Sequence, residues 1–224
     1  MSRQSLDSTF VVHSVPGSPF GRSVFAALEE KGARYRLAAV APGAHRSEPH
    51  ISRHPFGRVP VLEHGGYLLY ETQAILRYLD RVLPTPPLTP ADPRAAGRMD
   101  QVMNINDWYL FQGVCNVIGF ERVVKPRLLK QPADEANVAQ ALPKGVAVIA
   151  ELSRLLGGSA YLAGETMSLA DLLVAPQIDF LAMTPEWTAL SADAPNLVAW
   201  LARMNDHASM KATTWDRVAQ LAAA

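Results

Sequence analysis

The stretch PFGRVPVL (residues 55–62), followed by ETQAIL (residues 71–76), decides the fold of this chain. Proline cannot donate to a β-ladder, so Pro60 is expected at the start of a strand. A cis bond between Val59 and Pro60 would let Val59 offer its backbone to an extended ligand. The pair Glu71-Thr72 opens the next helix, where outward-pointing N–H groups suit a ligand carboxylate. The combination predicts a receptor for a small peptide rather than for a nucleotide.

Around this stretch, the first half of the chain alternates strand and helix signals. A β-branched run indicates a first strand, and apolar residues at helical spacing indicate a helix that stops at Gly32. His64-Gly65-Gly66 between two apolar runs is typical of a hairpin. The expected strands are residues 9–14, 35–40, 61–63 and 67–70, and the expected helices are residues 20–31 and 72–83. This order describes an α/β domain over residues 1–84.

Prolines are concentrated in the segment that follows, so residues 85–93 are interpreted as an extended linker. Beyond it, residues 94–224 show helical periodicity with little strand-like alternation, which predicts an all-helical second domain. The expected helices are residues 94–117, 132–156, 169–183 and 195–207, with a short one near residues 211–221.

Composition excludes several classes of function. The chain has 224 residues, 49% of them apolar, and 21 basic side chains balance 21 acidic ones. This neutrality argues against a nucleic-acid partner. The single cysteine, Cys115, rules out an intrachain disulfide and indicates a reducing compartment. The polar N-terminus lacks the apolar region of a signal peptide, and no apolar run approaches about 20 residues, so a cytoplasmic protein without a membrane partner is expected.

These features together resemble the cytosolic glutathione transferase family over most of the chain. The likeness rests on Ser18-Pro19-Phe20, His45-Arg46, the Asn/His-Pro-Phe-Gly-x-Val-Pro block at residues 54–60, Glu71-Thr72, and GETMSLAD at residues 164–171. The spacing from His45 to Pro60 is most similar to serine-type members such as the plant phi class. The resemblance implies a thioredoxin-like N-terminal domain, an all-helical C-terminal domain, a homodimer, and glutathione as cosubstrate without a further cofactor.

Ser18 is the catalytic candidate that the resemblance implies. Only a few per cent of a thiol with a pKa of about 8.5 is ionised at neutral pH, and a hydroxyl that donates to the sulfur favours the thiolate. The simpler interpretation is that Ser18 only caps the first helix, with Pro19 at its first position. Ser14 and Ser23 are rivals, although Ser14 comes one strand residue too early in the family pattern and Ser23 would face along the helix.

No cysteine stands at position 18, and Cys115 lies in a predicted helix of the other domain, where a buried apolar role is expected. A thiol–disulfide oxidoreductase is therefore disfavoured.

The remaining glutathione contacts follow from the same resemblance. Glu71 would pair with the γ-glutamyl ammonium, and the Thr72 hydroxyl and N–H would donate to the neighbouring carboxylate. Val59, fixed by Pro60, would offer its N–H and C=O to the cysteinyl unit. The simpler alternatives are an ordinary helix cap beside a surface glutamate and an ordinary rigid turn.

His45 and Arg46 match family positions that contact the glycine carboxylate, which arginine can bind bidentately. A solvated basic loop is the alternative interpretation, and the role of Arg58 is left open. His50, Arg53 and His54 are expected at the surface. The histidines of this loop are accompanied by no carboxylate or cysteine pattern, so no metal site is expected.

The second substrate is expected between the two domains, in a pocket lined by Phe20, Trp108, Tyr109, Phe111 and Phe120, although an aromatic stripe on a helix is also typical of a core. Ser168 and Asp171, three residues apart before an apolar run, predict a structural capping box rather than a catalytic pair.

The sequence thus predicts a detoxifying transferase that joins the glutathione sulfur to an apolar electrophile. Glutathione-dependent peroxide reduction or isomerisation in the same site is one alternative. A non-catalytic binding module that keeps the fold is the other.

Overall fold

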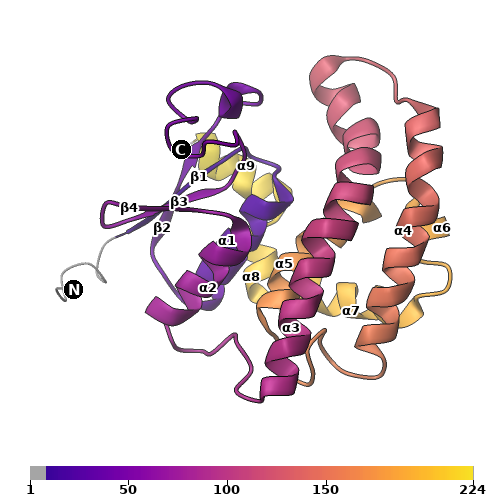
Figure 1. Cartoon of the computed structure of the whole chain (residues 1–224). Helices are drawn as coiled ribbons and strands as arrows, with labels where there is room; N and C mark the ends of the chain where they lie inside the picture. The colour runs from indigo at the N-terminus through magenta and orange to yellow at the C-terminus, as the bar shows by residue number, and fades with distance from the viewer. Residues whose placement is uncertain (1–8, 224) are drawn as a thin grey trace. The chain divides into compact units, whose positions relative to one another are not determined.

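A four-stranded mixed sheet organises the first part of the chain in the computed structural model, which describes residues 9–223 (Figure 1). Strands β1 (Phe10–Ser14), β2 (Tyr35–Ala39), β3 (Val61–His64) and β4 (Tyr67–Tyr70) lie in the order β2-β1-β3-β4. Strand β1 runs parallel to β2 and antiparallel to β3, and β3 and β4 form the predicted hairpin. Gly65 and Gly66 both have positive φ, 57° and 81°, as the favoured two-residue hairpin turn requires.

Helices α1 (Pro19–Glu30) and α2 (Thr72–Val82) cover one face of this sheet. The ring of Phe25 on α1 lies 5.5 Å from that of Tyr35 on β2. His64 on β3 stacks on Phe10 at 4.0 Å and hydrogen-bonds through Nδ1 to the hydroxyl of Tyr78 on α2, at 2.9 Å. Since side chains alternate along a strand, the residues on this face are every second one, and they form a closed apolar core with the two helices.

Helix α1 lies unusually close to the strand that precedes it. A Cβ atom added at Gly21 would come 2.2 Å from Oγ of Ser14, so only glycine allows this approach. The helix ends as predicted: Lys31 is its C-cap, and Gly32 follows with a φ of 59°.

The end of the chain belongs to the first unit rather than to the helical one. Helix α8 (Ala208–Ala212) packs on α1 and helix α9 (Trp215–Ala223) on β2, as the yellow helices in Figure 1 show. Arg22 of α1 donates to the carbonyl of Met210 at 3.4 Å, and its guanidinium lies 4.7 Å from the Trp215 ring centre. The described residues up to Thr89 and those from Asp206 onward therefore form one compact unit, whereas the sequence assigned everything after residue 94 to the helical domain.

The second unit, Pro90–Asn205, is helical. Its elements are α3 (Pro93–Ile105), a wider π-type helix η3 (Asn106–Leu129), α4 (Glu135–Leu156), α5 (Leu169–Ala182), α6 (Trp187–Leu190) and most of α7 (Pro195–Asp206). The predicted end of the first helix at residue 117 is wrong, because α3 continues into η3 until Lys130 adopts a φ of 55°. Within residues 9–223, no helix is long and apolar enough to span a bilayer.

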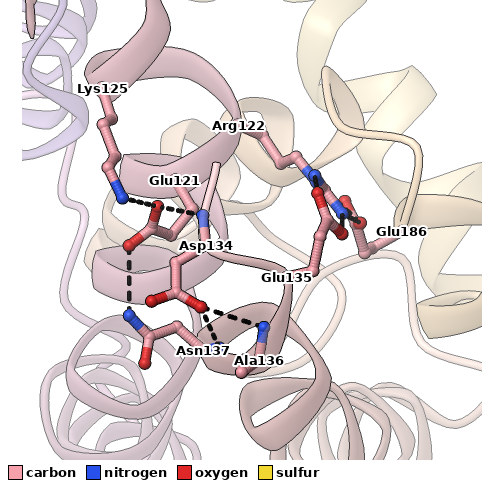
Figure 2. Close-up of polar contacts among 8 residues, drawn as sticks. All are labelled: Glu121, Arg122, Lys125, Asp134, Glu135, Ala136, Asn137 and Glu186. Carbon is pink, nitrogen blue, oxygen red and sulfur yellow. Dashed lines mark hydrogen bonds and ion pairs between the residues drawn. The ribbon is translucent and has the colours of Figure 1, made fainter. Parts of the chain in front are cut away.

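Charged side chains connect η3 to the start of α4 (Figure 2). The guanidinium of Arg122 donates to both carboxylate oxygens of Glu135, at 2.6 and 2.7 Å, and to Glu186. Glu121, which is 5% exposed, accepts from Lys125 and from the backbone N–H of Asp134, both at 2.8 Å. These contacts hold the start of α4 against η3 and satisfy N–H groups that a helix N-terminus leaves open.

The predicted capping box is present at the start of α5. The N–H and the hydroxyl of Ser168 both donate to Oδ2 of Asp171, at 2.9 and 2.8 Å. The other carboxylate oxygen accepts from the N–H of Leu162 and the indole N–H of Trp200, both at 2.9 Å. Burial raises the pKa of this carboxyl, and the four donors oppose that shift by favouring its charged form.

Candidate functional site

The strand register brings the predicted site segments to one end of the sheet. Ser14 pairs with Ala39 where β1 and β2 end, His13 pairs with Val61 where β3 begins, and Val61 pairs with Tyr70 where β4 ends. The connections at this end carry the candidate residues Ser18, His45, Arg46, Arg58, Val59, Pro60, Glu71 and Thr72. Segments far apart in the sequence therefore meet at one edge, together with the N-termini of α1 and α2.

Ser18 is the N-cap of α1, and its Oγ accepts from the backbone N–H of Gly21 at 3.2 Å. The side chain is half-buried. A hydroxyl has one donor and two acceptor positions, so the cap uses one acceptor and leaves the O–H free to donate elsewhere. Capping and donation to a thiolate are consequently compatible roles for the same side chain.

The rival serines are placed differently. Ser14 and Ser23 are both 0% exposed. The hydroxyl of Ser14 donates to the carbonyl of Val15 at 3.4 Å, and that of Ser23 donates to the carbonyl of Pro19 at 3.1 Å. Burial among backbone groups makes both a poorer match for a bound thiol than the half-buried Ser18. The catalytic role of Ser18 stays a prediction.

Glu71 has a strained backbone conformation. Its φ is 69°, in the left-handed region that costs a residue with a Cβ about 1–2 kcal/mol. As N-cap of α2 it makes no side-chain cap bond, and its exposed carboxylate forms no hydrogen bond or ion pair within residues 9–223. Thr72 follows, buried, with its N–H in the first turn, where no intrahelical acceptor exists. A free carboxylate beside open N–H groups suits a ligand that carries both an ammonium and a carboxylate.

Val59 lies just before the ladder of β3, which begins at Val61. The predicted cis bond to Pro60 is present. The N–H and C=O of Val59 make no backbone–backbone hydrogen bond within the described part of the chain, so both are available for strand-like pairing with a ligand. The side chain of Arg58 is exposed.

His45 and Arg46 lie in a short 3₁₀ turn, η2 (Ala44–Arg46). His45 is half-buried, and its Nδ1 is buried without a hydrogen-bond partner among residues 9–223. Burial lowers its pKa, and Arg46 and His50 lower it further. The imidazole is therefore neutral at pH 7, and the neighbouring Arg46 is exposed.

His50 and His54, expected at the surface, are buried instead, at 3% and 2% exposure. The expectation was wrong because the loop covers a face of the sheet and offers few apolar side chains to fill that space. Phe56 points outward at 70% exposure, while the two imidazoles point inward. The signal that sequence reasoning missed is their spacing of four, which places both rings on one side of a helical turn.

Within residues 9–223, no three His, Cys, Asp or Glu side chains are grouped so as to hold a metal ion. Cys115 is buried, as predicted, and its thiol donates to the carbonyl of Gln177 at 3.7 Å. Burial raises the pKa of this thiol, so it is unreactive at neutral pH.

A pocket of about 640 Å³ lies in the second unit, between η3 and α4. Its lining includes two of the predicted second-substrate residues, Trp108 and Tyr109, which are 68% and 64% exposed. Phe111 and Phe120 are not part of the lining, so the aromatic residues of this helix do not share one cavity. Phe20 lies on α1 in the first unit, and its predicted contact with the second substrate stays a prediction.

Known proteins resemble the chain in both halves. The family model described as glutathione S-transferase, N-terminal domain, matches residues 12–87, and the C-terminal domain model matches residues 118–208. A glutathione S-transferase of Hyoscyamus muticus is 33% identical over 195 residues, covering 85% of this chain and 91% of that protein. Glutathione S-transferase F7 of Arabidopsis thaliana is 30% identical, covering 88% of this chain and 94% of that protein.

Solved structures agree with the sequence relatives. The apo form of glutathione S-transferase III has a TM-score of 0.81 at 26% identity, covering 92% of this chain and 95% of that one. Glutathione S-transferase I bound with lactoylglutathione has a TM-score of 0.79 at 27% identity, covering 96% and 99%.

Proposed function

The chain belongs to the glutathione S-transferase family and is a glutathione transferase, and we propose that it joins the glutathione sulfur to an apolar electrophile with Ser18 stabilising the thiolate. The observation that carries the proposal is the meeting of Ser18, Val59 and Glu71 at one end of the sheet, which follows from the strand register. The bound conjugate in a structural relative supports glutathione as the ligand of this end.

In the proposed binding mode, each candidate residue contacts a different part of glutathione. The ligand ammonium pairs with Glu71, and the neighbouring carboxylate accepts from the first turn of α2 at Thr72. The cysteinyl unit pairs with the backbone of Val59, which places its sulfur near the N-terminus of α1. The glycine carboxylate meets Arg46, with His45 beside it. The side chain of Arg58 is exposed, and its carbonyl accepts a hydrogen bond from His50.

The chemistry needs a thiolate, and Ser18 supplies a hydrogen bond to it. The hydroxyl donates to the sulfur while Gly21 N–H donates to the hydroxyl oxygen, and this second bond makes the O–H a stronger donor. The thiol proton leaves to solvent, and the sulfur lone pair forms the carbon–sulfur bond. With an aryl halide the halide departs with the bonding electrons, and with an enal the electrons of the C=C bond take up a proton from solvent. Lowering the thiol pKa by about two units corresponds to roughly 2.7 kcal/mol, within reach of a charge-assisted hydrogen bond plus a helix terminus.

Calorimetry with glutathione and S-hexylglutathione tests the proposal directly. Binding of both at the N-terminal site is expected, followed by turnover of an aryl halide or an enal in the presence of glutathione. A hydroperoxide and an isomerisation substrate in the same panel distinguish the two alternative reactions. Absence of binding at millimolar glutathione would refute the proposal.

Trp108 and Tyr109 are proposed as part of the second-substrate site because both side chains are large, exposed and line the pocket. Both belong to the π-type helix η3, and π-type turns are common at functional sites. Phe20, Phe111 and Phe120 are proposed with less structural support. Their effect on KM for the electrophile, at saturating glutathione, is the measurement that separates lining residues from core residues.

We also propose a cytoplasmic homodimer that acts in detoxification and needs no cofactor besides glutathione. The single cysteine supports a reducing compartment. Dimerisation is supported by the family and by exposed apolar side chains such as Phe56. Light scattering is expected to give twice the chain mass of 24.4 kDa, and the monomer mass across micromolar concentrations would contradict it.

A further inference from the structure

Two buried imidazoles lie under the loop that leads to Val59. The rings of His50 and His54 are nearly parallel, at 23°, with their centres 6.4 Å apart. They lie against the sheet face opposite α1 and α2. His54 contacts Tyr70 there, and the register places Tyr70 beside Val61 and His13 on the same face.

Each ring is connected to one half of the glutathione site. His50 Nε2 lies 2.7 Å from the carbonyl oxygen of Arg58, the residue directly before Val59. A carbonyl only accepts, so Nε2 carries the proton. The ring of His54 lies 4.6 Å from that of Tyr70, the residue directly before Glu71. His50 and His54 therefore contact the residues that precede Val59 and Glu71, the two positions proposed to bind glutathione.

We propose that His50 and His54 are positioning residues that hold Val59 and Glu71 in their binding geometry, and that they do so only as neutral imidazoles. The inference rests on the proposed function, because Val59 and Glu71 are the residues expected to hold glutathione. The consequence is a site that loses affinity for glutathione as the solution becomes acidic.

The surroundings of the pair explain the need for neutrality. Nδ1 of His50 and of His54 are both buried without a hydrogen-bond partner in the described part of the chain. Protonation would place an N–H donor at each, facing no acceptor, and that is costly in a buried position. An open loop, in which water solvates the charged rings, is then favoured.

The charged neighbours add to this cost. Burial lowers the pKa of His54, and His50 and Arg58 lower it further. Burial also lowers the pKa of His13 on β1, whose ring hydrogen-bonds to Glu63 on β3 and faces the charges of Arg53 and His50. Because the pKa of His54 is lower in the closed loop than in an open one, acidification below about pH 6.5 favours the open loop.

His45 has the opposite effect on binding. It is proposed to lie beside the glycine carboxylate, so its protonation would strengthen the ligand contact. A loss of affinity at low pH therefore points to the buried pair rather than to His45.

Titration of S-hexylglutathione binding by calorimetry, between about pH 8 and about pH 5, tests the inference. The alkylated sulfur removes the thiol from the pH profile. The unaltered protein is expected to lose affinity about tenfold over this range as the open loop becomes favoured. His50→Phe, which keeps a ring and removes the donor, is expected to bind about tenfold more weakly at every pH.

Two variants separate geometry from titration. In His50→Gln the amide N–H replaces Nε2–H, so affinity at neutral pH is expected within about threefold of the unaltered protein. The double variant His50→Gln/His54→Asn has no titratable group in the pair and is expected to lose the acid-side decline. His64→Gln, a buried histidine on the opposite face of the sheet, is the matched control and is expected to keep the original profile.

An unchanged affinity in His50→Phe would overturn the inference, and so would an acid-side decline that persists in the double variant. If His50→Phe fails to fold, the pH profiles of His50→Gln and of the double variant decide. Failure of the unaltered protein to bind S-hexylglutathione at any pH is a distinct result, which overturns the proposed function itself.

Discussion

The Oγ atom of Ser18 lies 3.2 Å from the backbone nitrogen of Gly21 and accepts its N–H, while the hydroxyl proton stays free to donate. Helix capping and thiolate stabilisation, the two roles that the sequence left open for this serine, are therefore compatible. The same oxygen caps α1 and is positioned at the helix N-terminus, where the positive end of the helix dipole favours an anion. A thiolate bound there would be stabilised by both.

Ser18→Ala is expected to raise the pKa of the bound glutathione thiol and to lower turnover at pH 7, with part of the loss recovered at higher pH. Glutathione affinity is expected to stay within a few-fold, because Val59, Glu71 and Thr72 are the residues proposed to hold the peptide. Ultraviolet absorbance of the thiolate in the binary complex reports the pKa directly. Ser18→Gly is the matched variant, since glycine keeps the helix cap to within a few tenths of a kcal/mol but lacks the hydroxyl. An unchanged thiol pKa in both would transfer the role to Ser14, to Ser23 or to backbone N–H groups.

Glu71→Ala is expected to weaken glutathione binding by roughly 2–4 kcal/mol, because a desolvated ammonium loses its partner. Glu71→Gln, which removes only the charge, is expected to lose most of the same affinity. Calorimetry measures both.

Glu71→Gly separates binding from strain at the same position. Glycine adopts a φ of 69° without penalty, so its melting temperature is expected to match or exceed that of Glu71→Ala, while binding is lost. Equal glutathione affinity in the alanine variant and the unaltered protein would remove Glu71 from the site.

The sequence predicted the sheet well because the signals there are local. Pro60 marks a strand start, Gly65-Gly66 marks a turn, and Glu71-Thr72 marks a helix start. Each constraint is set by one or two residues and their own backbone. The order of strands then places the candidate residues at one end of the sheet without information from distant contacts.

The errors come from tertiary contacts, which local patterns do not encode. His50 and His54 were expected at the surface because they are polar. They are buried because they pack against a face of the sheet. The last helices were grouped with the helical half, whereas α8 packs on α1 and α9 packs on β2. The first long helix ran past its predicted end because η3 is anchored by Arg122 to distant glutamates.

Ser168→Ala is expected to destabilise the protein by about 1–2 kcal/mol, because the hydroxyl belongs to the cap of α5. The reaction is expected to be unchanged, because Ser168 is not among the residues proposed to act on glutathione. Thermal unfolding measures the loss. Activity per folded molecule is expected to be unchanged, and a more than tenfold decrease at constant melting temperature would contradict the structural assignment. Asp171→Ala is expected to cost more, since it leaves the indole N–H of Trp200 and the N–H of Leu162 without their acceptor.

The buried ion pair between Lys31 and Asp80 gives the last prediction. Its atoms are 2.6 Å apart, and the side chains are 0% and 9% exposed. Lys31 also donates to the carbonyl of Pro86, and Asp80 accepts from the N–H of Leu88 and the hydroxyl of Thr89. The pair thus fixes the end of α1 and the proline-rich segment to α2, where the sequence predicted only an extended linker.

Lys31→Met is expected to destabilise the protein by about 3–5 kcal/mol, because it leaves a buried carboxylate without its cation. The double variant Lys31→Met/Asp80→Leu is expected to recover part of this, and together with Asp80→Leu alone it gives the coupling energy of the pair. Lys211→Met, which breaks an exposed pair with Asp206, is the control and is expected to leave the melting temperature unchanged.

The pH dependence of stability checks the same pair with a definite sign. Burial raises the pKa of Asp80, but the hydrogen bonds from Lys31, Thr89 and Leu88 outweigh burial and lower it overall. A carboxyl with a lowered pKa in the folded state stabilises the fold above its unfolded pKa of about 3.9, and that stabilisation is lost as the pH falls further. Urea unfolding at a series of pH values is therefore expected to show a smaller acid-side loss in Asp80→Asn than in the unaltered protein. Parallel curves for the two proteins below about pH 4 would show that the pair does not contribute through the charge of Asp80.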